Sequence, residues 1–179
     1  DWYIQAVSGG LGPLGVYQGF KELFNMGLIN RIPKLAIIQA VGCAPMVNAF
    51  KAGKDVAEAI IPETSIIILS TGDPGKMYTY LWKLTQQYGG VMESVTDAEA
   101  FAAMRALAKS EGMAVEPATA VAFAGLEKLI RNGIIRPDEK VVVNCTGHTF
   151  PVEKHVLGDQ WAVDVHLSKD QSSAPREGL

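Results

Sequence analysis

Short apolar runs alternate with segments of helical periodicity along most of this chain, and this alternation limits the folds available to it. The runs predict strands at Trp2–Val7, Leu35–Ala40, Ile66–Leu69, Val91–Val95 and Val141–Cys145. Apolar runs such as Leu35–Ala40 are typical of parallel strands that are buried on both faces. Strands that alternate with helices predict right-handed βαβ units. The expected fold class is therefore α/β, with a parallel sheet and helices on both of its faces.

Two of the expected helices have clear start signals. Thr96-Asp97-Ala98-Glu99 has the sequence of a capping box, in which Thr96 is the N-cap residue. The next helix begins at Pro117, a favoured first helical residue, and continues to Arg131. Apolar spacing and terminal glycines predict three more helices, at Leu14–Met26, Ala44–Ala52 and Lys76–Tyr88.

The composition is that of an ordinary globular protein. Hydrophobic residues make up 48% and charged residues 20% of the 179 residues, which excludes disorder for most of the chain. The formal net charge of −3 lacks the basic excess of a nucleic-acid binder. No apolar run in the sequence approaches the roughly 20 residues that span a bilayer. Neither a nucleic acid nor a membrane is therefore an expected partner.

The cysteines and histidines indicate neither a disulfide framework nor a metal site. Cys43 and Cys145 lie inside apolar segments and form no CxxC pair, so we interpret both as buried, reduced thiols. Reduced thiols favour a cytoplasmic protein. His148, His155 and His166 have no metal-ligand spacing with one another or with the cysteines, so no metal is expected.

The two ends of the chain differ in character. Asp1-Trp2-Tyr3 leads straight into the first expected strand without an initiator methionine, and we expect the chain to be a piece of a longer protein. Apolar and polar residues alternate over 161–167, as in an edge strand or in an interface with a missing segment or a second subunit. Residues 169–179 are expected to form a polar tail.

A glycine-rich segment, Ser8-Gly9-Gly10-Leu11-Gly12-Pro13-Leu14-Gly15, joins the first expected strand to the first expected helix. Glycines at this place let the main chain turn sharply and let an anion approach backbone amides and a helix N-terminus. The segment therefore predicts a phosphate site, and a tight turn without a ligand is the alternative.

The same glycines resemble other phosphate-binding motifs only in part. Gly10, Gly12 and Gly15 have the GxGxxG spacing of dinucleotide-binding folds. However, the next strand ends in Gln39-Ala40-Val41-Gly42, with no carboxylate to hold a ribose. The segment also lacks the lysine of nucleoside-triphosphate-binding loops, so neither of these classes is favoured.

A second group of candidate residues follows later in the chain. Thr146-Gly147-His148 comes directly after the last expected strand, where open α/β sheets bind their ligands. Glu116 precedes the helix that begins at Pro117. Taken alone, the threonine is equally a strand-end cap, and the glutamate equally serves the helix dipole.

In this order, these segments resemble the threonine synthase family of fold-type II pyridoxal-phosphate enzymes. The resemblance extends from Val7 to His148 and implies that residues 1–168 are the C-terminal part of the cofactor-binding large domain, with a tryptophan synthase β-like fold. The matching stretches are Ser8–Gly12, Arg31–Lys34 running into Ile38–Pro45, Gly72–Pro74, Ser94–Glu99, Glu116–Ala120 and Thr146–His148.

The resemblance implies pyridoxal 5'-phosphate as cofactor and assigns roles around it. Backbone amides of the glycine-rich segment would hold the phosphate, and Thr146 would offer its hydroxyl to the pyridine nitrogen. Glu116 would lie near the same ring edge, and Gly72 would pack beside the cofactor. The cofactor-binding residues implied in this way are Ser8, Gly9, Gly10, Leu11, Gly12, Gly72, Glu116 and Thr146.

No lysine of this chain stands in the sequence context of the family's Schiff-base lysine. That lysine, and the loop that holds the substrate carboxylate, are expected upstream, so no catalytic residue is expected within these 179 residues. The missing N-terminal part of the same protein is thus an expected partner, together with a second copy of the chain. The chain alone is expected to be inactive.

The implied activity is that of a lyase in amino-acid biosynthesis that replaces phosphate on an O-phospho-amino acid: O-phosphohomoserine and water would give threonine. Two departures bear on the substrate. The loop reads Gly10-Leu11-Gly12-Pro13 where threonine synthases commonly have Gly-Asn-Ala-Gly-Asn, and Thr149-Phe150-Pro151-Val152 replaces their Gly-Leu-Lys-Asp. Cysteate synthase, which uses O-phosphoserine and sulfite, is therefore an alternative. A non-catalytic phosphate-binding α/β domain is another.

Overall fold

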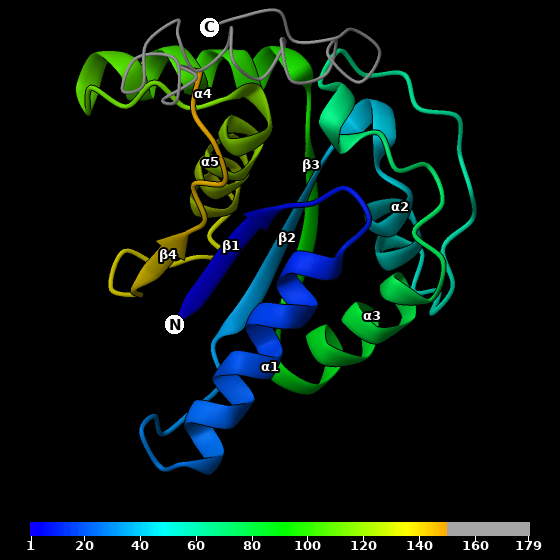
Figure 1. Ribbon diagram of the computed structural model, residues 1–179, viewed down its shortest axis with the longest axis vertical. Helices are drawn as coiled ribbons and strands as arrows, with labels where there is room; N and C mark the ends of the chain where they lie inside the picture. Colours follow the sequence, from blue (N-terminus) through cyan, green and yellow to red (C-terminus); the bar gives the residue numbers. More distant parts are fainter. Residues whose placement is uncertain (150–179) are drawn as a thin grey trace, which may run out of the picture. The chain divides into compact units, whose positions relative to one another are not determined.

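The computed structural model describes residues 1–149, and within them four parallel strands form one sheet (Figure 1). The strand order is β3-β2-β1-β4, and the register pairs Ile4 of β1 with both Ala36 and Val143. The expected parallel α/β sheet is thereby confirmed. The strands are β1 (Trp2–Ala6), β2 (Lys34–Ala40), β3 (Val91–Val95) and β4 (Val141–Val143).

Helices cover both faces of this sheet, as the alternating pattern predicted. Figure 1 shows α1, α2 and α3 on one face and α4 and α5 on the other. Two short 3₁₀ helices, η1 and η2, lie in the connections. The bounds are α1 (Leu11–Asn25), η1 (Val41–Cys43), α2 (Pro45–Lys51), η2 (Ile67–Leu69), α3 (Lys76–Tyr88), α4 (Asp97–Ser110) and α5 (Pro117–Arg131).

Two hydrophobic cores lie on opposite faces of the sheet. Successive residues of a strand point to opposite faces, so Ile37 and Ile38 of β2 belong to different cores, and both are fully buried. Ile37 packs in the core with Met46 of α2, whereas Ile38 packs in the core with Leu129 of α5. A strand buried on both faces fits the apolar run predicted at this position.

One predicted strand is wrong. Residues 66–69 do not join the sheet; they form the turn of η2, with hydrogen bonds from Leu69 N to Ile66 O and from Ser70 N to Ile67 O. Ile66 and Leu69 are buried, whereas Ile67 and Ile68 are exposed. This burial repeats every three residues, as in a 3₁₀ helix, and a run of four apolar residues alone does not distinguish it from a buried strand.

The last predicted strand is shorter and more exposed than expected. Strand β4 ends at Val143, and Val142 retains 60% of its accessible surface. Within the described residues β4 pairs only with β1, so it is an edge strand rather than a buried one. Cys145 follows this edge and is exposed, contrary to expectation, whereas Cys43 is buried as expected; both thiols are free.

The opposite edge of the sheet, at β3, is closed by side chains. The Glu93 carboxylate lies 2.6 Å from Lys51 Nζ of α2 and 3.4 Å from Lys128 Nζ of α5. It also accepts a hydrogen bond from Ser94 N, while Lys128 Nζ donates to Ser94 O. One buried carboxylate therefore links helices from both faces around this strand, and both main-chain groups of Ser94 are engaged.

Several predictions from the sequence fall on residues 150–179, outside the described part of the chain. These are the edge strand over 161–167, the polar tail, His155 and His166. The end of the expected domain at residue 168 also lies there. None of the helices in residues 1–149 is both long enough and apolar enough to cross a membrane.

The capping box of α4 gives a test of local stability. Thr96 Oγ1 accepts a hydrogen bond from Glu99 N at 3.2 Å, and Glu99 Oε2 accepts one from Thr96 N at 2.7 Å. Thr96→Ala leaves an amide of the first turn without its acceptor, so we expect urea denaturation to show a loss of about 1 kcal/mol in unfolding free energy. Ser110→Ala, at the exposed end of the same helix, should change it by less than about 0.5 kcal/mol. Equal losses in both variants would contradict a specific role for the cap.

Candidate functional site

The two groups of candidate residues emerge at the same edge of the sheet. The glycine-rich segment follows β1, and Thr146 follows β4, the strand paired with β1 (Figure 1). Asn144 N donates to Ile4 O at 2.9 Å, so the pairing of these strands continues beyond Val143. Parallel strands have their carboxyl ends at one edge, which is where open α/β sheets bind ligands.

The turn after β1 requires glycine. Gly10 is the N-cap residue of α1 and has φ of +86°, a left-handed conformation that side chains disfavour. A Cβ at Gly10 would also lie 2.8 Å from Leu81 Cδ1 and 2.9 Å from Met46 Cε. The left-handed conformation therefore favours glycine here, and a side chain would also require the ends of Leu81 and Met46 to shift.

The first turn of α1 leaves several backbone amides available. Helix α1 begins at Leu11, three residues earlier than expected, and Pro13 occupies its first turn, where no amide is needed. The amides of residues 9–12 donate no hydrogen bond to any of residues 1–149, and no side chain caps the helix. Unpaired amides at the positive end of a helix dipole fit an anion.

Ser8 connects this turn to a distant part of the chain. Its Oγ lies 2.5 Å from Thr71 Oγ1 and accepts a hydrogen bond from Thr71 N at 3.2 Å. Thr71 precedes Gly72, where a Cβ would collide with the carbonyl oxygen of Ile60. The close approach of these two chain segments explains the glycine at position 72, and its predicted place beside a cofactor stays a prediction.

The segment between α2 and α3 is held at the same edge of the sheet. Glu63 N donates to Gly42 O, just beyond β2, at 2.7 Å. Thr64 and Ser65 donate to the carboxylate of Asp97 at the start of α4. Burial raises the pKa of Asp97, but the hydrogen bonds from Ser65 and Thr64 outweigh it and lower the pKa below its ordinary value. This long connection is therefore anchored beside the site.

A hydrogen-bond network surrounds Thr146. Thr146 Oγ1 lies 2.8 Å from Thr119 Oγ1 and donates to Glu116 Oε1 at 3.2 Å. Thr119 Oγ1 accepts from Gly147 N at 3.0 Å and lies 3.1 Å from Gly147 O. Thr119 is fully buried and Glu116 partly buried, whereas Thr146 is exposed. The network therefore holds one exposed hydroxyl at the end of β4.

Two glycines bring this network together. A Cβ at Gly147 would lie 2.7 Å from Glu116 Cδ, and Gly147 O accepts a hydrogen bond from Glu116 N at 3.1 Å. A Cβ at Gly125 would lie 2.5 Å from Ile38 Cγ1, so α5 packs closely against β2. Close packing of α5 positions its N-cap residue Glu116 and Thr119 of its first turn against the end of β4.

Sequence reasoning did not select Thr119 as a site residue. The available signals were its place in the matching stretch Glu116–Ala120 and its hydroxyl side chain between Ala118 and Ala120, at the start of the helix predicted from Pro117. A buried polar side chain needs hydrogen-bond partners, and here they come from residues 146 and 147, which no local pattern connects to position 119.

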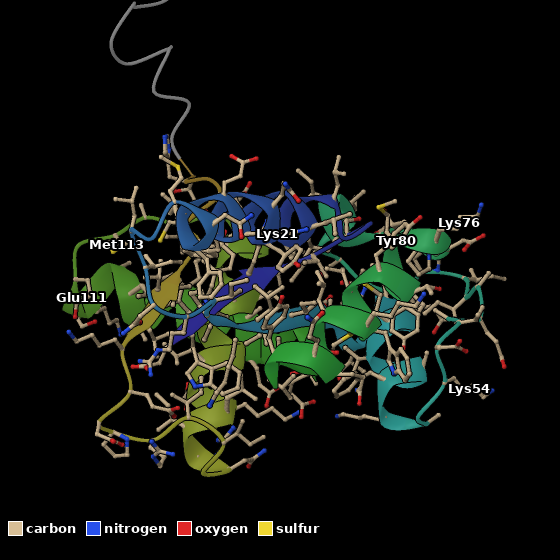
Figure 2. All side chains as sticks on the ribbon, turned by 90° about the horizontal axis from the view of Figure 1, so that it is seen from below. Lys21, Lys54, Lys76, Tyr80, Glu111 and Met113 are labelled. Carbon is tan, nitrogen blue, oxygen red and sulfur yellow. The ribbon has the colours of Figure 1, made fainter. Side chains whose placement is uncertain are left out.

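The described lysines have other partners or extend from the surface (Figure 2). Figure 2 shows Lys54 and Lys76 extending from the surface, and Lys21 is exposed on α1. Lys34 pairs with Glu139 and Lys51 with Glu93. In residues 1–149 no lysine forms a hydrogen bond or an ion pair with the glycine-rich segment or with Thr146. Lys128 is half-buried, but its ammonium group is already engaged by Glu93 and Ser94 O.

Comparison with known proteins identifies the family. A family model described as pyridoxal-phosphate dependent enzyme matches residues 1–147. The chain belongs to this family. It is 42% identical over 146 residues to a threonine synthase of Methanosarcina acetivorans, covering 79% of this chain and 35% of that protein. It is 32% identical over 157 residues to a cysteate synthase of Methanospirillum hungatei, covering 82% of this chain and 37% of that protein. The resemblance inferred from the sequence is thus confirmed.

Solved structures support the same fold. The chain resembles serine racemase from maize with a TM-score of 0.66 at 18% identity, over 93% of this chain and 48% of that one. It resembles an L-serine ammonia-lyase from Rhizomucor miehei with a TM-score of 0.65 at 22% identity, over 90% of this chain and 49% of that one. The predicted fold-type II architecture is confirmed. The chain spans about a third of the length of the curated relatives.

The glycine turn gives the second test. In the full-length protein, Gly10→Ala forces a side chain into a left-handed conformation and into Leu81 and Met46. We expect a loss of roughly 1–3 kcal/mol in unfolding free energy and weaker binding of pyridoxal phosphate. The control is Gly19→Ala in the same helix but outside the glycine-rich segment, where a Cβ meets nothing within 4 Å. This control should stabilise the protein by about 0.5–1 kcal/mol and leave cofactor affinity unchanged. Unchanged affinity in Gly10→Ala would contradict a phosphate site at this turn.

Proposed function

We propose that this chain is the C-terminal part of a threonine synthase-like enzyme that replaces phosphate on an O-phospho-amino acid, converting O-phosphohomoserine and water to threonine. The observation that carries the proposal is that two features lie at the same edge of the sheet. These are unpaired amides at the start of α1 and the exposed hydroxyl of Thr146 after the neighbouring strand. Identity of 42% to a threonine synthase supports it.

The glycine-rich segment would hold the phosphate of pyridoxal 5'-phosphate. The amides of Gly9, Gly10, Leu11 and Gly12 have no competing partner among the described residues, and the dipole of α1 favours an anion beside them. Ser8, tied to Thr71, would fix the start of the segment. Gly72 would lie next to this anchored pair.

The residues after β4 would orient the pyridine ring. Thr146 would place its hydroxyl at the ring nitrogen, with Glu116 near the same ring edge. A hydroxyl, unlike a carboxylate, does not force that nitrogen to be protonated. When bound, the cofactor serves as an electron sink for a substrate carbanion, so that phosphate can leave and a nucleophile can add.

The remaining parts of the site would come from the rest of the protein. The lysine that would bind the cofactor covalently, and the loop that would hold the substrate carboxylate, would belong to the rest of the protein, because this chain spans about a third of the length of its relatives. We therefore propose that the isolated chain has no turnover. A second copy of the whole protein remains a proposed partner.

Cysteate synthase is the second candidate, because a relative with this name is 32% identical over 82% of the chain. It would use the same two features with O-phosphoserine as substrate and sulfite as nucleophile. The two candidates differ in substrate chain length and in the nucleophile, so a direct assay separates them.

The test is phosphate release by the full-length enzyme loaded with pyridoxal phosphate. We expect release from O-phosphohomoserine with formation of threonine. Release from O-phosphoserine only in the presence of sulfite would favour the second candidate instead. The 179-residue chain alone serves as control and should release phosphate from neither substrate. Absence of release from both substrates by the full-length enzyme would overturn the proposal in either form.

A further inference from the structure

We propose that Thr119 is a positioning residue that controls how Thr146 presents its hydroxyl proton to the cofactor's ring nitrogen. The inference rests on the proposed function, because it takes Thr146 as the partner of that nitrogen. It extends that function to a buried residue that would not touch the cofactor itself.

The number of available protons fixes the direction of the hydrogen bonds. A threonine hydroxyl has one proton to donate and two lone pairs that accept. An ionised carboxylate only accepts, so the contact of 3.2 Å between Thr146 and Glu116 uses the single proton of Thr146. We therefore assign the proton of the 2.8 Å contact between the two hydroxyls to Thr119, whose single proton could otherwise be donated to Gly147 O at 3.1 Å. Gly147 N donates in turn to Thr119.

The distances support this direction. A length of 2.8 Å is typical of a good O–H···O hydrogen bond, whereas Thr119 lies 3.1 Å from its other acceptor, Gly147 O. The donation therefore runs from Gly147 N to Thr119, from Thr119 to Thr146, and from Thr146 outward. Each donor in such a chain polarises the next.

Thr119 thus leaves the proton of Thr146 free for an outward acceptor. In the present structure that acceptor is Glu116, and this contact of 3.2 Å is the longest in the series of hydrogen bonds from Gly147 N to Glu116. A ring nitrogen at Thr146 would compete with Glu116 for this proton. Because Thr119 continues to donate to Thr146 Oγ1, Thr146 would act as a donor to an unprotonated nitrogen.

Burial makes Thr119 suited to this role. Its side chain is fully buried in the first turn of α5, whereas Thr146 is exposed. Helix α5 is held against β2 at Gly125. The orientation of the exposed hydroxyl is therefore set by a residue fixed in the core.

The experiment uses the full-length enzyme loaded with pyridoxal phosphate labelled with ¹⁵N in the ring. We measure the ¹⁵N chemical shift of the bound ring, which reports hydrogen bonding and protonation at the nitrogen, and the cofactor dissociation constant. Thr119→Val and Thr119→Ala should both weaken cofactor binding by about 3- to 10-fold. Both should move the ¹⁵N shift in the same direction as Thr146→Val. Thr119→Ser keeps the hydroxyl and should retain the wild-type shift.

Two further variants separate positioning from stability. Thr85 is a buried threonine of α3 whose hydroxyl donates to Trp82 O, away from the site. Thr85→Val should change the unfolding temperature and leave the ¹⁵N shift unchanged. If Thr119 acts through Thr146, adding Thr119→Val to Thr146→Val should have little further effect on the ¹⁵N shift or on affinity.

The outcomes distinguish this inference from the proposed function. If Thr146→Val alters the ¹⁵N shift but Thr119→Val and Thr119→Ala do not, the positioning role is overturned and the proposed function stands. Additive effects of the two substitutions would also overturn the positioning role. If Thr146→Val itself leaves the shift and the affinity unchanged, Thr146 does not contact the cofactor, and the site proposed for it falls as well.

Discussion

The double burial of β2 is the constraint on which the rest of this structure depends. Ile37 and Ile38 are both inaccessible to solvent, although they point to opposite faces of the sheet. Full burial of each such side chain contributes about 1.5–3 kcal/mol, and this gain requires a layer of helices on each face. The sheet is therefore covered by helices on both faces. Such coverage is typical of parallel strands, because the helical crossovers that connect them lie on the faces of the sheet.

The sheet also explains why the site has two separately built halves. Helix α1, from one layer, brings its free amides to the carboxyl end of β1, and α5, from the other layer, brings Glu116 and Thr119 to the end of β4. The halves belong to different hydrophobic cores, and the β1–β4 pairing and the packing of α5 against the sheet relate them to each other. A change in that pairing would shift one half against the other.

The sequence predicted the features that depend on local chemistry. The capping box, the helix beginning at Pro117 and the glycine turn after β1 each follow from residues that lie close together in the chain. The family resemblance could also be inferred, because several such segments occur in a fixed order. The sharp turn at the glycine-rich segment could be predicted from its strand–turn–helix context, whereas the left-handed conformation of Gly10 itself came from the structure.

The features that the sequence did not predict depend on distant contacts. Four apolar residues at 66–69 satisfy a strand pattern, but only the packed structure decides that two of them face solvent. The exposure of Cys145 follows from the position of β4 at an edge, which the strand's own composition does not report. Thr119 has its partners 27 and 28 residues away, so its role becomes visible only in three dimensions.

The closed edge at β3 has a consequence for how this sheet can grow. An incoming strand at β3 would have to displace both the Glu93 carboxylate and the Lys128 ammonium from the main chain of Ser94, and would leave a buried carboxylate short of partners. At β4 the outer edge meets no such obstacle within residues 1–149. Among the described residues, extension of the sheet is therefore less hindered at β4 than at β3, where the side chains around Ser94 disfavour edge-to-edge pairing.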